Sequence, residues 1–175
     1  MELASSVNFV LGILSIIAEI AVVFLASSWL FGFKIPEVLR LHALPLAFTA
    51  VLIATLGSLT YSEIIGYEPC KLCWIQRILM YPQVLILGLA VWGQHKGNRA
   101  LIDVSLIMSL IGAMVAFYHY LMQLGIIPEG SCAAVGYSVS CAERFVMEFG
   151  YLTIPMMALS AFLFIALFLR EKREE

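Results

Sequence analysis

The sequence predicts an all-α integral membrane protein, both from its composition and from the lengths of its apolar runs. Of the 175 residues, 62% are hydrophobic and only 13% are charged, with a mean hydropathy of +0.98. Soluble domains are about 45–50% apolar and about 25% charged, so a soluble fold of this length could not bury so much apolar surface. The chain also holds five apolar runs, each near the roughly 20 residues that cross a bilayer as a helix. A net charge of −2 gives no electrostatic basis for binding nucleic acid.

Each apolar run predicts one transmembrane helix. The first lacks Lys or Arg at its start and is too long for a secretory signal peptide, so we expect it to stay as a membrane span. Pro69 is expected to break the chain before the third. We find no internal repeat and no linker, which predicts a single membrane domain over residues 1–175. The predicted helices cover about residues 7–33, 41–62, 73–92, 100–124 and 152–169, with outer loops at 63–72 and 125–151.

Loop charge predicts the orientation, because Lys and Arg concentrate on the cytoplasmic side. With the N-terminus outside and the C-terminus inside, the cytoplasmic side has seven basic residues and the outer side three. The inner set is Lys34, Arg40, Lys96, Arg99, Arg170, Lys172 and Arg173, and the outer set is Lys71, Arg77 and Arg144. We therefore expect a multi-pass protein of the cytoplasmic (inner) membrane with its cysteines on the extracytoplasmic face, where disulfides persist.

Cys70 and Cys73 form a CxxC motif at the expected start of the third helix. Haem attachment would need His after the second cysteine, where Trp74 stands. A structural zinc site remains open, because CxxC is a common zinc-binding spacing. The context favours a redox-active disulfide: a thiol at a helix N-terminus has a lowered pKa, and Lys71 and Arg77 add positive charge. Cys73 and Arg77 are four residues apart and should share a helix face.

Cys132 and Cys141 enclose eight residues that include Gly136, and this loop is flexible enough to bring the two sulfurs together. One interpretation is a structural disulfide that pins the outer loop. The other is a second exchange station in series with Cys70 and Cys73, since thiol–disulfide exchange proceeds by direct thiolate attack. The presence of CxxC on the same side favours the relay. After Cys141, helical spacing of apolar residues predicts a short interfacial helix over about 142–149, with Arg144 and Glu148 paired on its polar face.

Three side chains are expected to surround one point in the outer leaflet. His119 lies about five residues before the outer end of the fourth helix, or roughly 8 Å at 1.5 Å per residue, and Arg77 enters from the same surface to a similar depth. With Cys73, they would offer a thiolate and hydrogen-bond donors to a quinone head group. Glu19 is a further ionisable residue within the membrane, either functional or hydrogen-bonded between helices. The sequence does not choose between ubiquinone and menaquinone.

These residues carry a resemblance to the DsbB family of disulfide-bond formation proteins, in particular its short-loop, BdbC-like type. The resemblance covers about residues 41–169. The matching motifs are Glu68-Pro69-Cys70-Lys71-Leu72-Cys73 with Arg77, His119 with Gln123, and Cys141-Ala142-Glu143-Arg144 followed by Pro155. The family usually has four spans, so the resemblance implies a four-helix transmembrane bundle plus an extra N-terminal transmembrane helix.

The resemblance implies a role for each site residue. Cys73 would face the quinone and Cys70 would exchange with the loop pair, so that Cys70–Cys73 and Cys132–Cys141 are the two disulfides. Cys132 would form the mixed disulfide with a thioredoxin-fold, DsbA-like thiol oxidase, and Cys141 would resolve it. Arg77 would bind and polarise the quinone, with His119 assisting. The implied activity is that of a quinone-dependent oxidoreductase that generates disulfides. A zinc-binding membrane scaffold that uses all four cysteines is the alternative from a different class.

Overall fold

The computed structural model describes residues 2–92, 97–129 and 139–173, and helices dominate this part of the chain. In order they are α1 (Glu2–Phe31), α2 (Glu37–Leu41), α3 (Ala43–Leu59), α4 (Lys71–Val91), α5 (Arg99–Gln123) and α6 (Ile154–Arg173). A π-helical turn, η1 (Thr60–Ile64), continues α3. Five of these helices, with η1 counted as part of α3, are long and apolar enough to cross a membrane. The predicted all-α membrane fold is confirmed.

The helix ends differ from the prediction where polar residues find partners. α6 continues past residue 169 to Arg173, whose guanidinium pairs with Asp103 of α5 at 3.0 Å. α1 begins at Glu2, ahead of residue 7, and within this added stretch the Ser6 hydroxyl donates to the Glu2 carbonyl. α2 was not predicted, since five residues after Pro36 are too few to produce a hydropathy signal.

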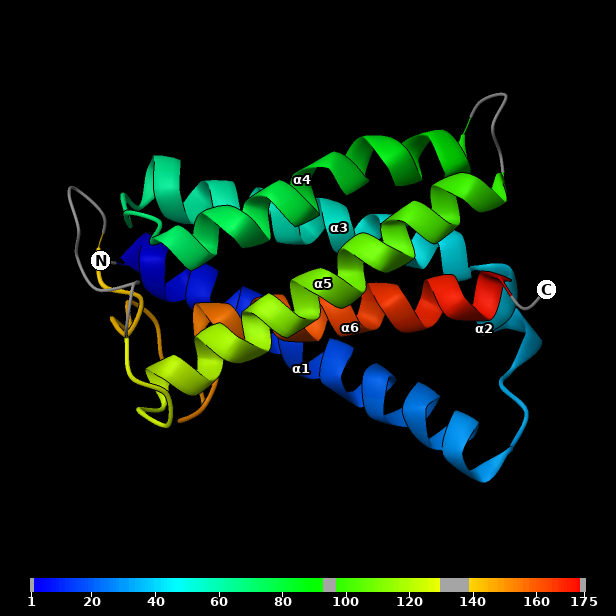
Figure 1. Cartoon of the computed structure of the whole chain (residues 1–175), viewed down its shortest axis with the longest axis horizontal. Coiled ribbons are helices and arrows are strands. Elements are labelled where there is room, and N and C mark those ends of the chain that lie inside the picture. Colours follow the sequence, from blue (N-terminus) through cyan, green and yellow to red (C-terminus); the bar gives the residue numbers. More distant parts are fainter. Residues whose placement is uncertain (1, 93–96, 130–138, 174–175) are drawn as a thin grey trace.

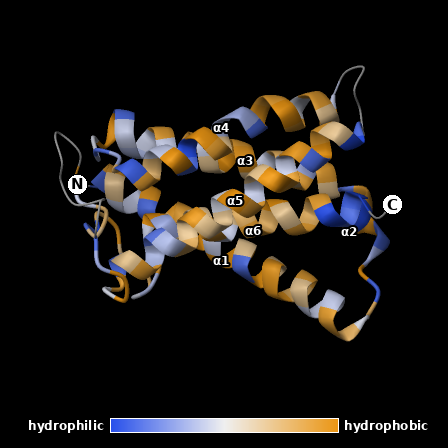
Figure 2. Ribbon diagram, viewed as in Figure 1, coloured by the Kyte–Doolittle hydropathy of each residue, from blue (hydrophilic) through white to orange (hydrophobic). Residues whose placement is uncertain are grey.

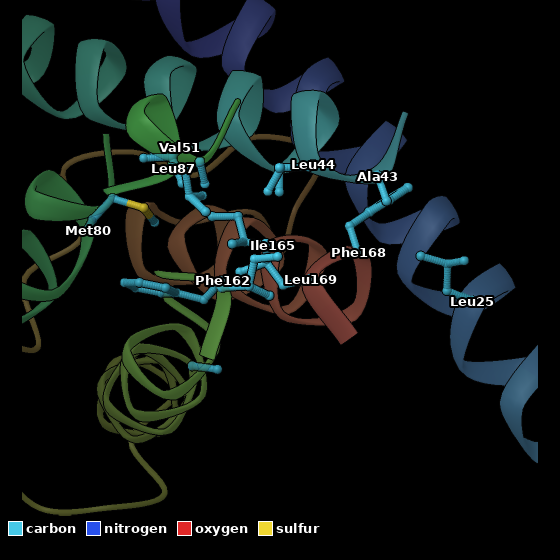
Figure 3. Packing of buried hydrophobic residues seen from close by; sticks show 14 of the residues in the cluster. Leu25, Ala43, Leu44, Val51, Met80, Leu87, Phe162, Ile165, Phe168 and Leu169 are labelled. Carbon is cyan, nitrogen blue, oxygen red and sulfur yellow. The ribbon is translucent and has the colours of Figure 1, made fainter. Parts of the chain in front are cut away.

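α6 is the centre of the bundle. It packs on α5, α3 and α1, while α4 packs on α3 and α5. Phe162, Ile165 and Leu169 of α6 interdigitate with side chains of α3 and α4 (Figure 3). Figure 2 shows hydrophobic residues on the outward faces of the helices as well, which is expected where the surroundings are lipid. α1 is the least buried of the five spans.

Different elements lie at the two ends of the bundle. One end of the bundle holds the start of α1, η1, the start of α4, the end of α5 and the segment after residue 139 (Figure 1). α2, the start of α5 and the end of α6 lie at the other end. Cys70, Cys73 and Cys141 belong to the segments at the first end, so the three described cysteines lie at the same end of the bundle.

Gly112 permits the close approach of α5 to α6. A methyl group at this position would overlap the ring of Phe162, which is fully buried and has no room to move. We expect Gly112→Ala to destabilise the bundle by about 1–3 kcal/mol, as overpacked cores do. Thermal unfolding in detergent measures the effect. Gly88→Ala is the matched control, because its added methyl would meet Phe48 at an ordinary 3.5 Å; equal unfolding temperatures for the two variants would contradict this packing.

Candidate redox site at one end of the bundle

Cys70 caps the N-terminus of α4. Its backbone is extended, and its sulfur accepts a hydrogen bond from the Cys73 amide at 3.4 Å. The helix therefore begins at Lys71 and not at residue 73, and the sulfur at the positive end of the helix is that of Cys70. The predicted start of this helix at residue 73 placed Cys73 at that position instead. The correction matters because the unpaired amides and the helix dipole act most strongly on the capping group.

The two thiols of the CxxC pair are free and adjacent, and the Cys70–Cys73 disulfide stays a prediction for the oxidised protein. Their Sγ atoms lie 3.2 Å apart, longer than the roughly 2.05 Å of a disulfide bond. Cys70 is buried, whereas Cys73 is half-buried. The two sulfurs are neighbours, as disulfide formation between them requires.

His119 of α5 contacts both Cys70 and Cys141. Its Nε2 lies 3.0 Å from the Cys141 carbonyl oxygen and 3.7 Å from the Cys70 sulfur. A carbonyl oxygen only accepts, so Nε2 carries the proton and donates it. The other nitrogen, Nδ1, then accepts from the side-chain amide of Gln76 at 3.1 Å. Gln76 thus fixes the ring orientation, a role that sequence reasoning missed.

The Cys70 thiol is placed to ionise readily. The hydrogen bond from the Cys73 thiol and the nearby His119 lower the pKa of Cys70 well below its ordinary value of 9.0, against an opposing effect of burial. A lowered thiol pKa means that the thiolate is present at neutral pH and is lost only when the pH falls into the acidic range.

The Cys70 thiolate should be visible in the ultraviolet. We expect the reduced protein to show thiolate absorbance at 240 nm at pH 7 that disappears on acidification. Cys70→Ser should remove it, and His119→Phe should move its loss to higher pH because one donor is gone. An acid titration of each purified variant makes the comparison. An unchanged titration in Cys70→Ser would assign the thiolate elsewhere.

Cys141 is fully buried beside this pair. The Glu129 carboxylate accepts from the Ala142 amide at 3.0 Å and from the Ser140 hydroxyl, which fixes the backbone on both sides of Cys141. The ligand atoms of Cys70, His119 and Cys141 lie within 4.8 Å of one another. Cys141 is disulfide-bonded. Cys132, its predicted partner, lies outside the described residues, so that pairing stays a prediction.

The short helix predicted over residues 142–149 is wrong. This segment is irregular, with Phe149 and Gly150 both at positive φ. Tertiary contacts override the helical spacing: the Phe145 ring stacks on Tyr67 at 5.0 Å, and the Val146 side chain is buried. Arg144 does not pair with Glu148, because its guanidinium donates to the Gln123 carbonyl of α5. The segment is anchored to the bundle end and does not lie as a helix in the interface.

Arg77 reaches across to α3. Its Nε donates to the Ser58 hydroxyl at 3.1 Å, and a terminal nitrogen donates to the Ser58 carbonyl at 3.0 Å. The guanidinium carbon also lies 5.4 Å from the centre of the Trp74 ring. Ser58 was not predicted as the partner of Arg77, because one serine in an apolar run carries no sign of its neighbour.

Cys73, Arg77 and His119 line a single cavity of about 290 Å³, together with Cys70. The predicted convergence of the first three residues is therefore found in the structure. Polar side chains gather at the end of the cavity near the cysteines, and the walls further along α3 and α6 are mostly apolar. Pockets for organic ligands typically combine an apolar lining with a few polar groups. The donor set and the shape fit a quinone, with hydrogen-bond donors at one end and room for an apolar group at the other.

Glu19 lies between helices. Its carboxylate accepts hydrogen bonds from the Tyr151 hydroxyl at 2.7 Å and from the Ser160 hydroxyl of α6 at 2.9 Å. Of the two interpretations offered by the sequence, the structure shows the hydrogen-bonded one. These contacts attach α1 both to α6 and to the segment that follows Cys141.

The chain is similar to known proteins over the part that holds this site. A sequence model of the family described as disulfide bond formation protein DsbB matches residues 40–170. A probable disulfide formation protein C of Bacillus cereus is 46% identical over 125 residues, which are 71% of this chain and 87% of that protein. Disulfide bond formation protein C of Bacillus subtilis is 42% identical over 135 residues, which are 74% and 91% of the two chains.

More distant similarity extends to a probable disulfide formation protein of Metapseudomonas resinovorans, 35% identical over 136 residues that cover 77% of this chain and 91% of that one. No solved structure matches the chain significantly. The family match begins after α1 and includes α3, α4, α5, most of α6 and all four cysteines of the chain. On this evidence the chain belongs to the DsbB family and is a multi-pass membrane protein of disulfide-bond formation.

Proposed function

We propose that this protein is a thiol:quinone oxidoreductase, which takes electrons from a thioredoxin-fold dithiol partner and passes them to a quinone in the membrane. One observation carries the proposal: the Cys70 sulfur lies within 4.8 Å of the Cys141 sulfur while the adjacent Cys73 lines an apolar cavity with Arg77. A site with these neighbours can exchange disulfides on one side and meet a lipid-soluble acceptor on the other.

Electrons enter through the loop pair. A thiolate of the partner attacks Cys132 of the Cys132–Cys141 disulfide, which forms a mixed disulfide and frees the Cys141 thiolate. Cys141 then attacks the Cys70 sulfur of a Cys70–Cys73 disulfide and releases the Cys73 thiolate. The partner's second thiol attacks the mixed disulfide, which forms the partner's own disulfide and frees the Cys132 thiolate. Cys132 then attacks the Cys141 sulfur of the Cys141–Cys70 disulfide, which restores Cys132–Cys141 and leaves Cys70 and Cys73 as a dithiol. Two electrons have moved: four S–S bonds have been broken and four formed, and the net change is loss of the Cys70–Cys73 disulfide and gain of the partner's disulfide.

The remaining residues act on the dithiol and on the acceptor site. A bound quinone takes up two electrons and two protons, which is what the Cys70–Cys73 dithiol releases on forming a disulfide. His119 donates to the Cys70 sulfur and holds it as the thiolate that closes on Cys73. Arg77, fixed by Ser58, presents a permanent positive charge and donors to a carbonyl oxygen in the cavity.

The same reaction requires a particular orientation. We place the bundle end with the cysteines outside the cytoplasmic membrane, where the partner encounters Cys132 and oxidising conditions persist. The excess of Lys and Arg near α2, the start of α5 and the end of α6 supports this orientation.

The test is quinone reduction by a reduced thioredoxin-fold protein. Purified protein in nanodiscs receives the reduced partner and either ubiquinone or menaquinone, and quinone absorbance is followed. Wild type should reduce quinone in proportion to the partner oxidised. Cys132→Ala should block this transfer, because the entry disulfide is missing. Quinone reduction that persists in Cys132→Ala would reject the loop pair as the entry point.

A structural zinc site is the competing interpretation, since Cys70, His119 and Cys141 bring three ligand atoms together. A sulfur within a disulfide has no thiolate to offer, so zinc binding would require Cys141 to be reduced. Metal analysis with a thiol count separates the two: stoichiometric zinc with four thiols supports the scaffold, whereas two or four of the cysteines in disulfides supports the oxidoreductase.

A further inference from the structure

α1 lies outside the family match, yet it forms part of the cavity at the redox site. Five of its side chains line that cavity: Leu11, Leu14, Ser15, Ile17 and Ala18. Four of these positions, 11, 14, 15 and 18, follow the spacing of one helix face. Away from the cysteine end, the other walls come chiefly from α3 and α6, and α4, α5 and the segment after residue 139 line the cysteine end. The extra helix is therefore a wall of the site.

Specific side-chain contacts hold α1 against the rest of the bundle. Glu19 accepts from Tyr151 and Ser160, as described above. The Leu11 side chain packs against Gly57 of α3, where a Cβ would come within 3.0 Å of it. Gly12 faces the Phe149 ring at the same distance. α1 packs chiefly on α6, and side chains of α1 and α3 line the cavity from two sides.

The cavity is elongated along α3 and polar at one end. Lining residues of α3 run from Ser58, beside Arg77, to Leu46. Twelve residues at 1.5 Å span about 18 Å, more than half of the roughly 30 Å hydrocarbon core. The hydroxyls along the way are satisfied internally: Thr49 donates to the Pro45 and Leu46 carbonyls, and Ser15 donates to the Leu11 carbonyl. Beyond the cysteine end, the walls offer an occupant apolar contact only.

We propose that α1 supplies one wall of a channel for the isoprenoid tail of the quinone, so that this helix determines the affinity for tailed quinones. The proposal rests on the proposed function, which puts the head group at Cys73 and Arg77. A tail that leaves this point has the α1–α3–α6 channel as its continuation. The head group itself does not need α1, because Cys73 and Arg77 belong to α4.

The test compares a quinone head group with and without its tail. Equilibrium binding of 2-methyl-1,4-naphthoquinone, and of the same ring carrying four isoprene units, is measured in nanodiscs by quenching of tryptophan fluorescence. Ala18→Phe narrows the channel, and we expect it to weaken binding of the tailed quinone about tenfold, or about 1.4 kcal/mol. Binding of the tail-less quinone should be unchanged. Ile20→Phe is the matched control, because Ile20 is 65% exposed on the same helix and does not line the cavity.

A second measurement does not depend on how well the variants fold. A tailed quinone carrying a photoreactive diazirine at its far end is cross-linked to wild type, and labelled peptides are identified by mass spectrometry. Labels on α1 at Leu14, Ile17 or Ala18 support the channel. Labels confined to α3 and α6, or equal weakening of both quinones by Ala18→Phe, overturn it while leaving the proposed function intact. Wild type that binds neither quinone overturns both proposals.

Discussion

Replacing Cys73 with alanine is expected to lower quinone reduction by a dithiol partner by on the order of 10³-fold or more, since loss of a reacting group removes the chemical step itself. Cys73 is the half-buried thiol of the CxxC pair and lines the cavity. Without it, Cys70 has no neighbour with which to form the disulfide. The measurement is the initial rate of quinone absorbance loss with the reduced partner in excess.

Two control experiments show which electron-transfer step is lost in Cys73→Ala. In Cys73→Ala the Cys70 thiolate should still attack the Cys141 sulfur of the Cys132–Cys141 disulfide, because those sulfurs lie within 4.8 Å. This exchange forms a Cys70–Cys141 disulfide and releases the Cys132 thiolate. Cys132→Ala should lose partner-driven reduction but keep a single turnover of quinone by its own reduced Cys70 and Cys73. Wild-type rates in Cys73→Ala would instead fit a plain multi-span protein whose cysteines have no part in electron transfer.

Arg77→Gln is expected to lower quinone reduction by about 10²–10³-fold, the range seen when a preorganised donor to a developing negative charge is removed. The guanidinium is held by two hydrogen bonds to Ser58 and lines the cavity with Cys73. Glutamine keeps a donor but removes the positive charge. Single-turnover reduction by the pre-reduced protein measures this step without the partner.

Two further variants separate charge from geometry. Arg77→Lys keeps the charge but loses the planar fork that spans the two oxygens of Ser58, so an intermediate rate is expected. Ser58→Ala removes one of the two anchors and leaves the backbone carbonyl in place, so its effect should be the smallest of the three. Exchange between Cys141 and Cys70 should proceed normally in all of them. A wild-type rate in Arg77→Gln would remove Arg77 from the acceptor site.

The membrane fold was predictable because it depends on composition and length alone. An apolar run of about 20 residues has few stable states other than a membrane-spanning helix, so the five spans follow from the sequence. α2 escaped prediction because five residues give no periodic signal. The segment over 142–149 has helical spacing, but packing of Phe145 on Tyr67 and burial of Val146 outweigh local propensity. Tertiary contacts of this kind are invisible in a single sequence.

The candidate site was predictable to the extent that it depends on helix geometry. Spacing of four residues places Cys73 and Arg77 on one face, and the rise per residue places His119 at a matching depth. The partners of these residues were not predictable. Ser58 and Gln76 are single polar residues within apolar runs, and only the packing of α3, α4 and α5 shows which side chain each one meets. Likewise, the role of Cys70 as the helix cap depends on where α4 begins.

The central claim is that the Cys70–Cys73 dithiol delivers its electrons directly to a quinone in the adjoining cavity. The most direct measurement is a single turnover of the pre-reduced Cys132→Ser/Cys141→Ser double variant, in which only the CxxC pair can react. On mixing with quinone under anaerobic conditions, we predict one hydroquinone formed per protein together with one Cys70–Cys73 disulfide, identified by mass spectrometry. Quinone that stays oxidised while Cys70 and Cys73 remain thiols would contradict the account.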